Sequence, residues 1–119
     1  NKKIILIDRF TDSTIAYQHY GMGVDLNLIE TLNKYLLKDI RVSFTFLNIV
    51  NQKNLQKRLK QRKSLNRYDK FKMSFYNKVQ KGFLNLSKKQ KNKYQLINSN
   101  LDINNNEKLI LDKIDRLIK

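Results

Sequence analysis

The sequence predicts an α/β domain built on a parallel sheet. Short continuous apolar runs are typical of strands buried on both faces, and segments with apolar residues at three- and four-residue spacing lie between them. The expected order is strand, helix, helix, strand, helix, helix, strand, helix, the alternation that parallel sheets require. A chain of 119 residues has the length of one domain.

The first strand and helix are expected near the start of the chain. Lys3–Ile7 is an apolar run and predicts a buried strand. A helix is expected from about Asp12 to Tyr20. It ends at Gly21 and Gly23, because glycine favours the backbone conformation at helix ends.

A second helix is expected from the cap residue Asp25 to about Leu37. Its apolar side chains recur at helical spacing, and we expect them to pack on the sheet. They are Leu28, Ile29, Leu32, Tyr35 and Leu36.

The middle of the chain predicts a strand, a helix and a loop. Val42–Val50 is rich in β-branched and aromatic residues, as buried strands are. Asn51 begins a helix that turns Leu55 and Leu59 toward the core. The basic segment from Arg62 to about Lys72 has no sustained period, and we expect a mobile loop.

The last third predicts a long helix to about Gln90, a third strand at Tyr94–Ile97 and a final helix. The long helix carries the apolar residues Phe75, Val79, Phe83 and Leu86. The final helix is expected to begin near the caps Asn104–Asn106, with Glu107 in its first turn. It is expected to bury Leu109, Ile110, Ile114, Leu117 and Ile118. Three strands would leave open sheet edges unless more strands precede Asn1.

The charge, the cysteine content and the apolar runs of the sequence limit which partners and sites we expect. The chain has 25 basic and 10 acidic residues, for a net charge of +15, which favours an anionic partner. A general bias toward lysine, asparagine and isoleucine explains the charge more readily, so an electropositive site has to be argued from particular residues. The chain has no cysteine, which excludes disulfides and thiolate metal sites. Its apolar runs are shorter than the roughly 20 residues that span a membrane. We therefore expect a cytoplasmic protein that contacts no membrane.

Charged residues follow the first predicted strand. Ligands of open parallel sheets bind at the carboxyl ends of the strands, where Asp8 and Arg9 lie. A carboxylate at this position suits Mg²⁺ in phosphoryl transfer, and a guanidinium suits a phosphate. Asp8 could equally cap the next helix, and Arg9 could form a surface ion pair.

The helix that follows combines a hydroxyl, an aromatic ring and an amide. Thr14, Tyr17 and Gln18 lie within three or four residues of one another, so a helix would place them on one face. This combination suits a nucleobase with its sugar. A solvated polar face is the alternative.

Five segments together resemble the thymidylate kinase family. Asp8-Arg9-Phe10 and "DSTIAYQ" resemble its DR-aromatic and S-x-x-A-Y-Q motifs, and "GMGVDLNLIETLN" resembles its next glycine-rich turn and helix. "RLKQRKSLNRYD" resembles its lid, and "FYNKVQKGFLNL" resembles its F-x-x-x-V-x-x-G-Y/F-L helix. The matches occur in the same order and span almost the whole chain. The resemblance implies a P-loop NTPase-like three-layer fold with about three strands here, and transfer of the ATP γ-phosphoryl group to dTMP for dTTP biosynthesis.

The resemblance implies roles for the acceptor-side residues. Arg9 would bind the dTMP phosphate, and Asp8 would lie near that phosphate and Mg²⁺. Tyr17 would lie against the deoxyribose and disfavour a 2′-hydroxyl. The remaining dTMP-side residues would be Phe10, Ser13, Thr14 and Gln18.

The resemblance also implies a lid at about residues 58–72, in which Arg58, Arg62 and Arg67 close over ATP. Without the family, three arginines in a basic loop indicate a solvated face. The chain departs from the family pattern in and before the second predicted strand and in the lid. These departures affect the expected charges of the lid more than the expected fold. The departing residues are Val42, Ser43, Asn48, Lys63, Asn66 and Asp69.

The family's phosphate-binding loop is missing from this sequence. No G-x-x-x-x-G-K-[ST] motif is present, and the only glycines are Gly21, Gly23 and Gly82. We therefore expect the C-terminal part of a single thymidylate-kinase-like domain, with negligible turnover by itself and a homodimer in the complete enzyme. Two alternatives are a small basic nucleic-acid-binding module and a truncated gene product without activity.

Overall fold

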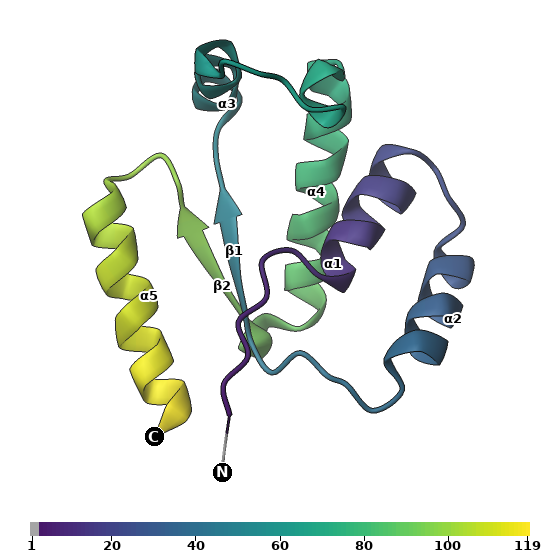
Figure 1. Ribbon diagram of the computed structural model, residues 1–119, viewed down its shortest axis with the longest axis vertical. Coiled ribbons are helices and arrows are strands. Elements are labelled where there is room, and N and C mark those ends of the chain that lie inside the picture. The colour runs from purple at the N-terminus through teal and green to yellow at the C-terminus, as the bar shows by residue number, and fades with distance from the viewer. Residues whose placement is uncertain (1–2) are drawn as a thin grey trace. The chain divides into compact units, whose positions relative to one another are not determined.

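The computed structural model describes residues 3–119, with Tyr68 described by its backbone alone. The chain forms two compact units (Figure 1). Of the described residues, unit 1 comprises 3–41 and 74–89, and unit 2 comprises 42–73 and 90–119. The fold class is α/β, with a parallel sheet and flanking helices.

The sequence predicted five helices and three strands, and the observed bounds follow for the described residues. Unit 1 holds α1 (Thr11–Thr14), η1 (Ile15–Gly21), α2 (Leu26–Leu37) and nearly all of α4 (Met73–Lys89). Unit 2 holds β1 (Thr45–Ile49), α3 (Gln52–Gln61), η2 (Tyr68–Lys70), η3 (Lys91–Lys93), β2 (Tyr94–Asn98) and α5 (Ile103–Ile118).

The sheet of unit 2 consists of β1 and β2, which pair in parallel from Thr45 opposite Tyr94 to Ile49 opposite Asn98. Both segments were predicted as strands, and both are confirmed. Leu47 and Ile97 are buried although they occupy successive pairs of the register. Since successive side chains alternate between faces, each face of the sheet contributes one of the two to the core.

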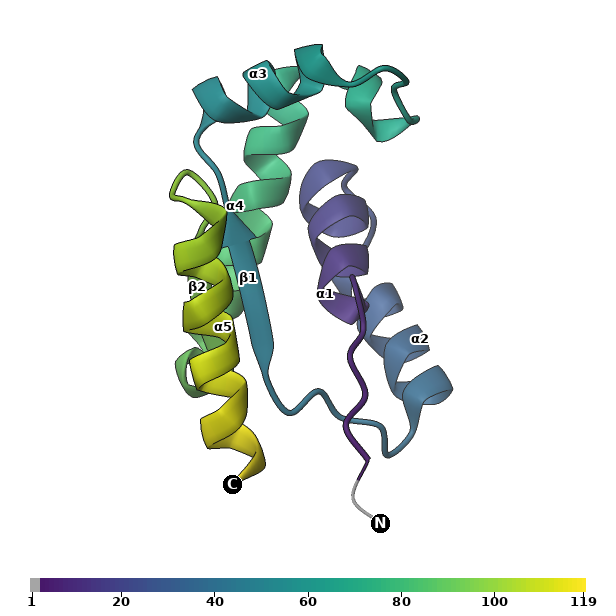
Figure 2. The same cartoon turned by 60° about the vertical axis from the view of Figure 1, so that its left-hand side comes forward.

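Polar side chains cap the helices of unit 2. The Asn51 side chain accepts a hydrogen bond from the backbone N–H of Asn54 and begins α3, as expected. The cap of α5 is Asp102, which accepts from Asn104, rather than a residue of Asn104–Asn106. Helix α5 then runs back beside the strands in the opposite direction (Figure 2).

Helical packing builds the core of unit 1. The predicted helix at Asp12–Tyr20 is present, but over Ile15–Gly21 it is a π-helix, which has a wider turn than an α-helix. Gly21, the last residue of η1, has no side chain and so allows close contact with α4: a Cβ at this position would lie 2.6 Å from Cε2 of Phe75. The apolar pattern did not predict the wider turn, because seven residues are too few to separate the two periods.

The predicted strand at Lys3–Ile7 is wrong. The segment has no regular secondary structure, and the side chains of Ile4–Ile7 are 56–80% exposed. A strand exists only where its backbone groups pair with a neighbour. Within the described residues the sheet ends at β1 and β2, so the expected third strand is not formed.

Helix α2 forms as predicted, with the Asp25 side chain accepting from the backbone N–H of Leu28, but most of its apolar face is exposed. Ile29 is buried. The other four apolar residues are 50–77% exposed, and we call them the α2 apolar face: Leu28, Leu32, Tyr35 and Leu36.

The predicted burial along α5 is also wrong. Ile110 and Ile114 are half-buried, whereas Leu109, Leu117 and Ile118 are exposed. Nor does Glu107 lie in the first turn, because α5 begins earlier than expected. Helical period identifies which face is apolar, but the packing partner decides whether it is covered. Among residues 3–119, no helix is both long and apolar enough to cross a bilayer.

Candidate functional site

A bend at Asp8 and Arg9 leads from the exposed apolar segment into α1. Arg9 has a φ of 62°, in the left-handed region that side chains other than glycine rarely adopt. Both side chains are exposed. The backbone therefore turns sharply at the two residues for which the sequence predicted a phosphate and metal role.

Arg9, Ser13 and Tyr17 lie together in unit 1. The Nε of Arg9 donates a hydrogen bond to Oγ of Ser13 over 3.3 Å. The guanidinium carbon of Arg9 lies 4.6 Å from the centroid of the Tyr17 ring, in the range of a cation–π contact. Ser13 of α1 and Tyr17 of η1 are four residues apart along the helical segment, and Arg9, in the bend before α1, contacts both, so the structure forms a cluster of a cation, a hydroxyl and a ring.

Helix α4 holds the Tyr17 ring in place. The ring centroids of Phe75 and Phe83 lie 6.0 and 6.3 Å from that of Tyr17, with interplanar angles of 61° and 79°. These are edge-to-face contacts, the arrangement that aromatic quadrupoles favour. Two residues of the predicted F-x-x-x-V-x-x-G-Y/F-L helix thus support a predicted substrate-side residue.

The remaining predicted acceptor-side residues have separate surroundings. Phe10 is half-buried just before α1, and its carbonyl accepts from the backbone N–H of Ser13 over 3.0 Å. Thr14 is exposed, whereas Gln18 is half-buried. Thr14 therefore differs from Gln18 in exposure, although an α-helical spacing predicted one shared face.

His19 stabilises the turn after η1 and was not singled out by the sequence. Its Nδ1 lies 2.8 Å from the carbonyl oxygen of Val24, and the backbone N–H of Val24 donates to the carbonyl of Gln18 over 2.9 Å. Gly23 lies within the turn at a φ of 79°. The neighbouring glycines signalled a turn, but they did not identify its side-chain partner.

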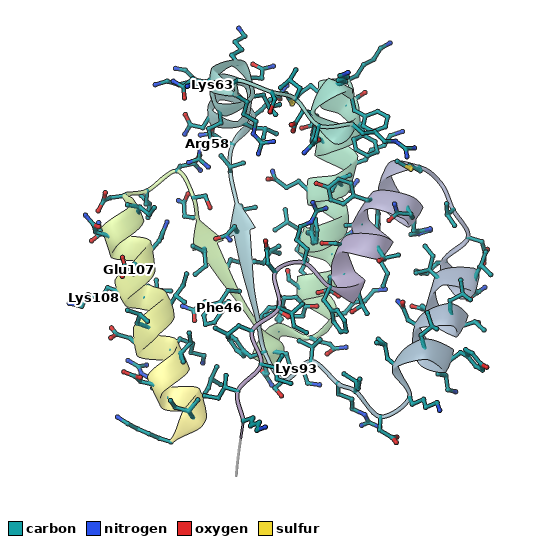
Figure 3. All side chains as sticks on the ribbon, in the orientation of Figure 1. Phe46, Arg58, Lys63, Lys93, Glu107 and Lys108 are labelled. Atoms are coloured by element: carbon teal, nitrogen blue, oxygen red, sulfur yellow. The ribbon has the colours of Figure 1, made fainter. Side chains whose placement is uncertain are left out.

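The three predicted lid arginines, of which Arg58 is labelled in Figure 3, lie in unit 2 and have different surroundings. Arg58 of α3 donates from Nη2 to the carbonyl of Ser99, just after β2. Arg62 forms an ion pair with Asp69, with Nη1 and Oδ2 separated by 2.6 Å. Arg67 is exposed. Arg58 and Arg62 therefore form contacts within unit 2 in this structure.

Asn66 and Asp69 form reciprocal hydrogen bonds within the lid. The Asn66 side chain accepts from the backbone N–H of Asp69 over 3.0 Å, and the Asp69 carboxylate accepts from that of Asn66 over 2.9 Å. The Asn66 N–H, together with the Arg62 guanidinium, lowers the pKa of Asp69 below its ordinary value of 3.8, although burial opposes this. Two of the three departures from the family's lid pattern, Asn66 and Asp69, therefore bind each other.

An asparagine network joins the end of β2 to the start of α3. The side-chain oxygen of Asn100 accepts from the backbone N–H of Asn51 over 3.1 Å and from the Asn54 amide over 2.9 Å. Asn98 in turn accepts from the Asn100 backbone and side-chain amides over 3.0 and 2.8 Å. The sequence reasoning missed this network; its signal was "NSN" directly after a predicted strand.

The metal-binding capacity of the chain is limited. Within residues 3–119, no three histidine, cysteine, aspartate or glutamate side chains come together as a metal site. Asp8 offers a single exposed carboxylate. This donor set fits Mg²⁺ only where the other ligands are nucleotide oxygens and water, a common mode for this ion.

Known proteins with similar sequences support one family. The sequence model described as thymidylate kinase matches residues 1–110. The chain belongs to the thymidylate kinase family. Thymidylate kinase of Wolbachia pipientis subsp. Culex pipiens is 36% identical over 105 residues, which cover 88% of this chain and 49% of that protein. Thymidylate kinase of Sulfurihydrogenibium is 32% identical over 111 residues, covering 93% and 53%.

A solved thymidylate kinase also has this fold. The crystal structure of thymidylate kinase from Ehrlichia chaffeensis superposes with a TM-score of 0.58 at 30% identity, covering 94% of this chain and 49% of the other. The P-loop NTPase-like fold class and the family resemblance are thereby confirmed. The chain spans about half the length of the thymidylate kinases that it matches.

Proposed function

We propose that this chain supplies the acceptor side and lid of an enzyme that transfers the ATP γ-phosphoryl group to dTMP and releases dTDP. The observation that best supports this proposal is the cluster of Arg9, Ser13 and Tyr17 in unit 1. The guanidinium can bind a phosphate, the hydroxyl can bind the polar edge of a nucleobase, and the fixed ring can pack against the sugar.

Arg9 binds the dTMP phosphate in this proposal, and its backbone supports the assignment. Strained conformations persist where the surroundings enforce them, and they cluster at functional sites. The exposed guanidinium already lies against Tyr17, so the cation is partly oriented before substrate arrives. Orientation before binding lowers the entropic cost of forming the complex.

Tyr17 selects a deoxyribose in this proposal. Its ring contacts both Phe75 and Phe83, so it cannot move aside easily. A 2′-hydroxyl placed against a fixed ring would lose its water without gaining a partner. Phe10, Ser13, Thr14 and Gln18 line the thymine side.

The lid arginines stabilise the transferring phosphoryl group in this proposal. Charge spreads over its oxygens in the transition state, and positioned guanidiniums stabilise that charge. Arg67 is exposed and available for phosphate, whereas Arg58 and Arg62 hold the Ser99 turn and Asp69. Asp8 is the residue that would hold Mg²⁺ beside the phosphates, where the ion would neutralise phosphate charge.

A phosphate-binding loop must come from residues outside this sequence. None of the 119 residues forms the G-x-x-x-x-G-K-[ST] motif, whose backbone amides would hold the ATP phosphates. We therefore propose that the chain is the C-terminal part of one kinase domain and turns over negligibly by itself. For the complete enzyme we propose a homodimer, supported by the exposed α2 apolar face.

Calorimetric titration with dTMP tests the acceptor site, using this chain and a chain extended by a thymidylate kinase phosphate-loop half. We expect the extended chain to bind dTMP at least tenfold more tightly than the ribose analogue. Arg9→Ala should weaken dTMP binding at least tenfold, whereas Arg41→Ala, an exposed arginine of the same unit, should leave it unchanged. Equal affinities for wild type and Arg9→Ala would contradict the assignment.

A further inference from the structure

A basic groove of about 780 Å³ lies in unit 2 and has no role in the proposed reaction. It is bounded by α5 and by the segments at the starts of β1 and β2. Sites for small organic ligands occupy about 300–1,000 Å³, so the groove has room for one.

The groove lies at the amino ends of the strands. Phe44 directly precedes β1, Tyr94 begins β2, and Lys91 lies in η3 just before it. The lid contact between Arg58 and Ser99 lies beyond the carboxyl end of β2. Because a five-residue strand is about 16 Å long, the groove is separate from that contact.

Four cationic side chains line the groove: Lys91, Lys108, Lys113 and Arg116. Asp112 is the one acidic residue of the lining. Arg116 lies in the last turn of α5, where a cation is favoured by the helix dipole. That effect does not account for Lys108 in the first half of the helix, or for Lys91 on another segment. Clustered cations around a hollow attract anions.

The groove also contains flat apolar surface and amides. Phe44 and Tyr94 contribute rings, and the Nζ of Lys113 lies 4.9 Å from the Phe44 centroid. Gln95 and Asn105 contribute amides that both donate and accept hydrogen bonds. Rings stack on nucleobases of any sequence, and nearby cations bind the attached phosphates.

We propose that this groove binds a nucleotide, with the base against Phe44 and Tyr94 and the phosphates near Lys108, Lys113 and Arg116. A bare phosphate would use the cations and leave the rings unused. An acidic peptide would place carboxylates on the cations but carries no obligatory flat ring. The shared chemistry, a base joined to phosphate, occurs in mononucleotides and in single-stranded nucleic acid.

Chemical-shift mapping of backbone amides tests the proposal on this 14.3 kDa chain. The probes are ATP, a thymidine hexanucleotide, tripolyphosphate and adenosine. We expect ATP and the hexanucleotide to shift residues 91–95 and 105–116, tripolyphosphate to bind at least tenfold more weakly, and adenosine not to saturate. A hexanucleotide at least tenfold tighter than ATP identifies nucleic acid as the source; similar affinities identify a mononucleotide.

Two results would overturn the proposal. One is equal binding of tripolyphosphate and ATP, which would describe a simple anion site. The other is a shift pattern confined to Asn98–Leu101, which would place ATP at the carboxyl ends of the strands.

Paired variants separate the groove from the general charge. Lys108→Glu with Arg116→Glu should weaken ATP binding at least tenfold. Lys53→Glu with Lys57→Glu makes the same change of net charge on exposed positions of α3 and should change the affinity less than twofold. Equal losses in both pairs contradict the proposal.

A ring variant tests the base contact. Phe44→Leu keeps an apolar side chain but removes the ring, so it should weaken ATP several-fold and leave tripolyphosphate unchanged. Lys108→Gln, at an exposed position, provides a second variant that preserves the fold. It should weaken ATP binding several-fold, and unchanged binding in both variants contradicts the proposal.

Discussion

Arg9 combines an unfavourable backbone with a defined side-chain position. Its φ of 62° costs about 1–2 kcal/mol for a residue with a Cβ. The side chain recovers part of this cost through Ser13 and the Tyr17 ring. Glycine would adopt this backbone without that cost, and the proposed phosphate role of Arg9 gives a reason for a side chain at this bend.

Substituting Arg9 separates backbone strain from side-chain function. Arg9→Gly and Arg9→Ala both remove the guanidinium, but only glycine relieves the strain. We expect Arg9→Gly to be more stable than Arg9→Ala by about 0.5–1 kcal/mol in denaturant unfolding, with dTMP binding lost in both. An alanine variant as stable as the glycine variant would show that this φ is not strained.

Asp69 predicts a pH dependence of the lid. Its pKa is lowered by the Asn66 N–H and by Arg62, so its ionised form stabilises the folded state. This contribution is present above pH 3.8, the ordinary value, and is lost as the pH falls through the lower folded-state pKa.

An NMR titration of the Asp69 carboxyl carbon in wild type and in Arg62→Ala separates the effect of Arg62 on the pKa of Asp69 from that of the Asn66 N–H. We expect a pKa below 3.8 in wild type and a rise in the variant, which still keeps the Asn66 hydrogen bond. Since Arg62 is 52% exposed, its removal should cost at most about 1 kcal/mol at pH 6 and nothing once Asp69 is protonated. Identical pKa values in the two proteins would exclude a role for Arg62.

At the scale of elements, η1 and α4 approach closely because glycines occur at their contact. A Cβ on Gly82 would lie 2.7 Å from Cγ and 2.9 Å from Cβ of Tyr20. These atoms are close to the Tyr20 backbone, so rotating the ring does not clear them. The two helices would have to separate.

Gly82→Ala should therefore destabilise unit 1 despite the better helix propensity of alanine. Propensity favours alanine by about 1 kcal/mol, whereas overpacking costs about 1–3 kcal/mol. We expect a net loss of about 1 kcal/mol in thermal unfolding. Asn77→Ala, at an exposed position of the same helix, should be neutral or stabilising. A gain in stability for Gly82→Ala would contradict this packing.

The asparagine network couples the turn after β2 to the start of α3. Asn100→Ala removes the acceptor for both Asn51 and Asn54. Because Asn100 is exposed, water replaces part of the loss, and we expect a cost of about 0.5–1.5 kcal/mol. Amide hydrogen exchange at Asn51 should accelerate, and exchange in α5 away from this turn should not. Unchanged exchange at Asn51 would show that the network is not formed in solution.

For the whole molecule, exposed apolar surface predicts association. The α2 apolar face is contiguous and exposed, and such surfaces in soluble proteins mark sites of interaction. We expect sedimentation velocity to show reversible association of the wild-type chain. Leu32→Lys with Leu36→Lys should abolish it, because two buried charges would oppose the contact.

The matched control adds the same charge to exposed polar positions of α2. Asn27→Lys with Thr31→Lys should leave the association unchanged. Equal loss of association in both pairs would assign the effect to net charge, and the homodimer proposal would then lose its support from α2.

The sequence by itself determined the helices with clear caps and the two segments that form strands. Asp25 and Asn51 bond to backbone N–H groups three residues away, so the information that begins these helices is local. The family was likewise determined by ordered motifs. The Asp8-Arg9-Phe10 and S-x-x-A-Y-Q motifs identified the acceptor-side candidates without any structure.

Only the tertiary structure decided how those segments are paired and covered. In the structure Ile4–Ile7 is an exposed segment, and the helix at Ile15–Gly21 is a π-helix. Arg58 and Arg62 form contacts within the chain. Most of these outcomes depend on groups far apart in the sequence or on a backbone angle that no residue pattern encodes, and the Arg62–Asp69 pair depends on how the loop between them folds. Apolar spacing states what a segment can bury, and the neighbouring elements determine what it does bury.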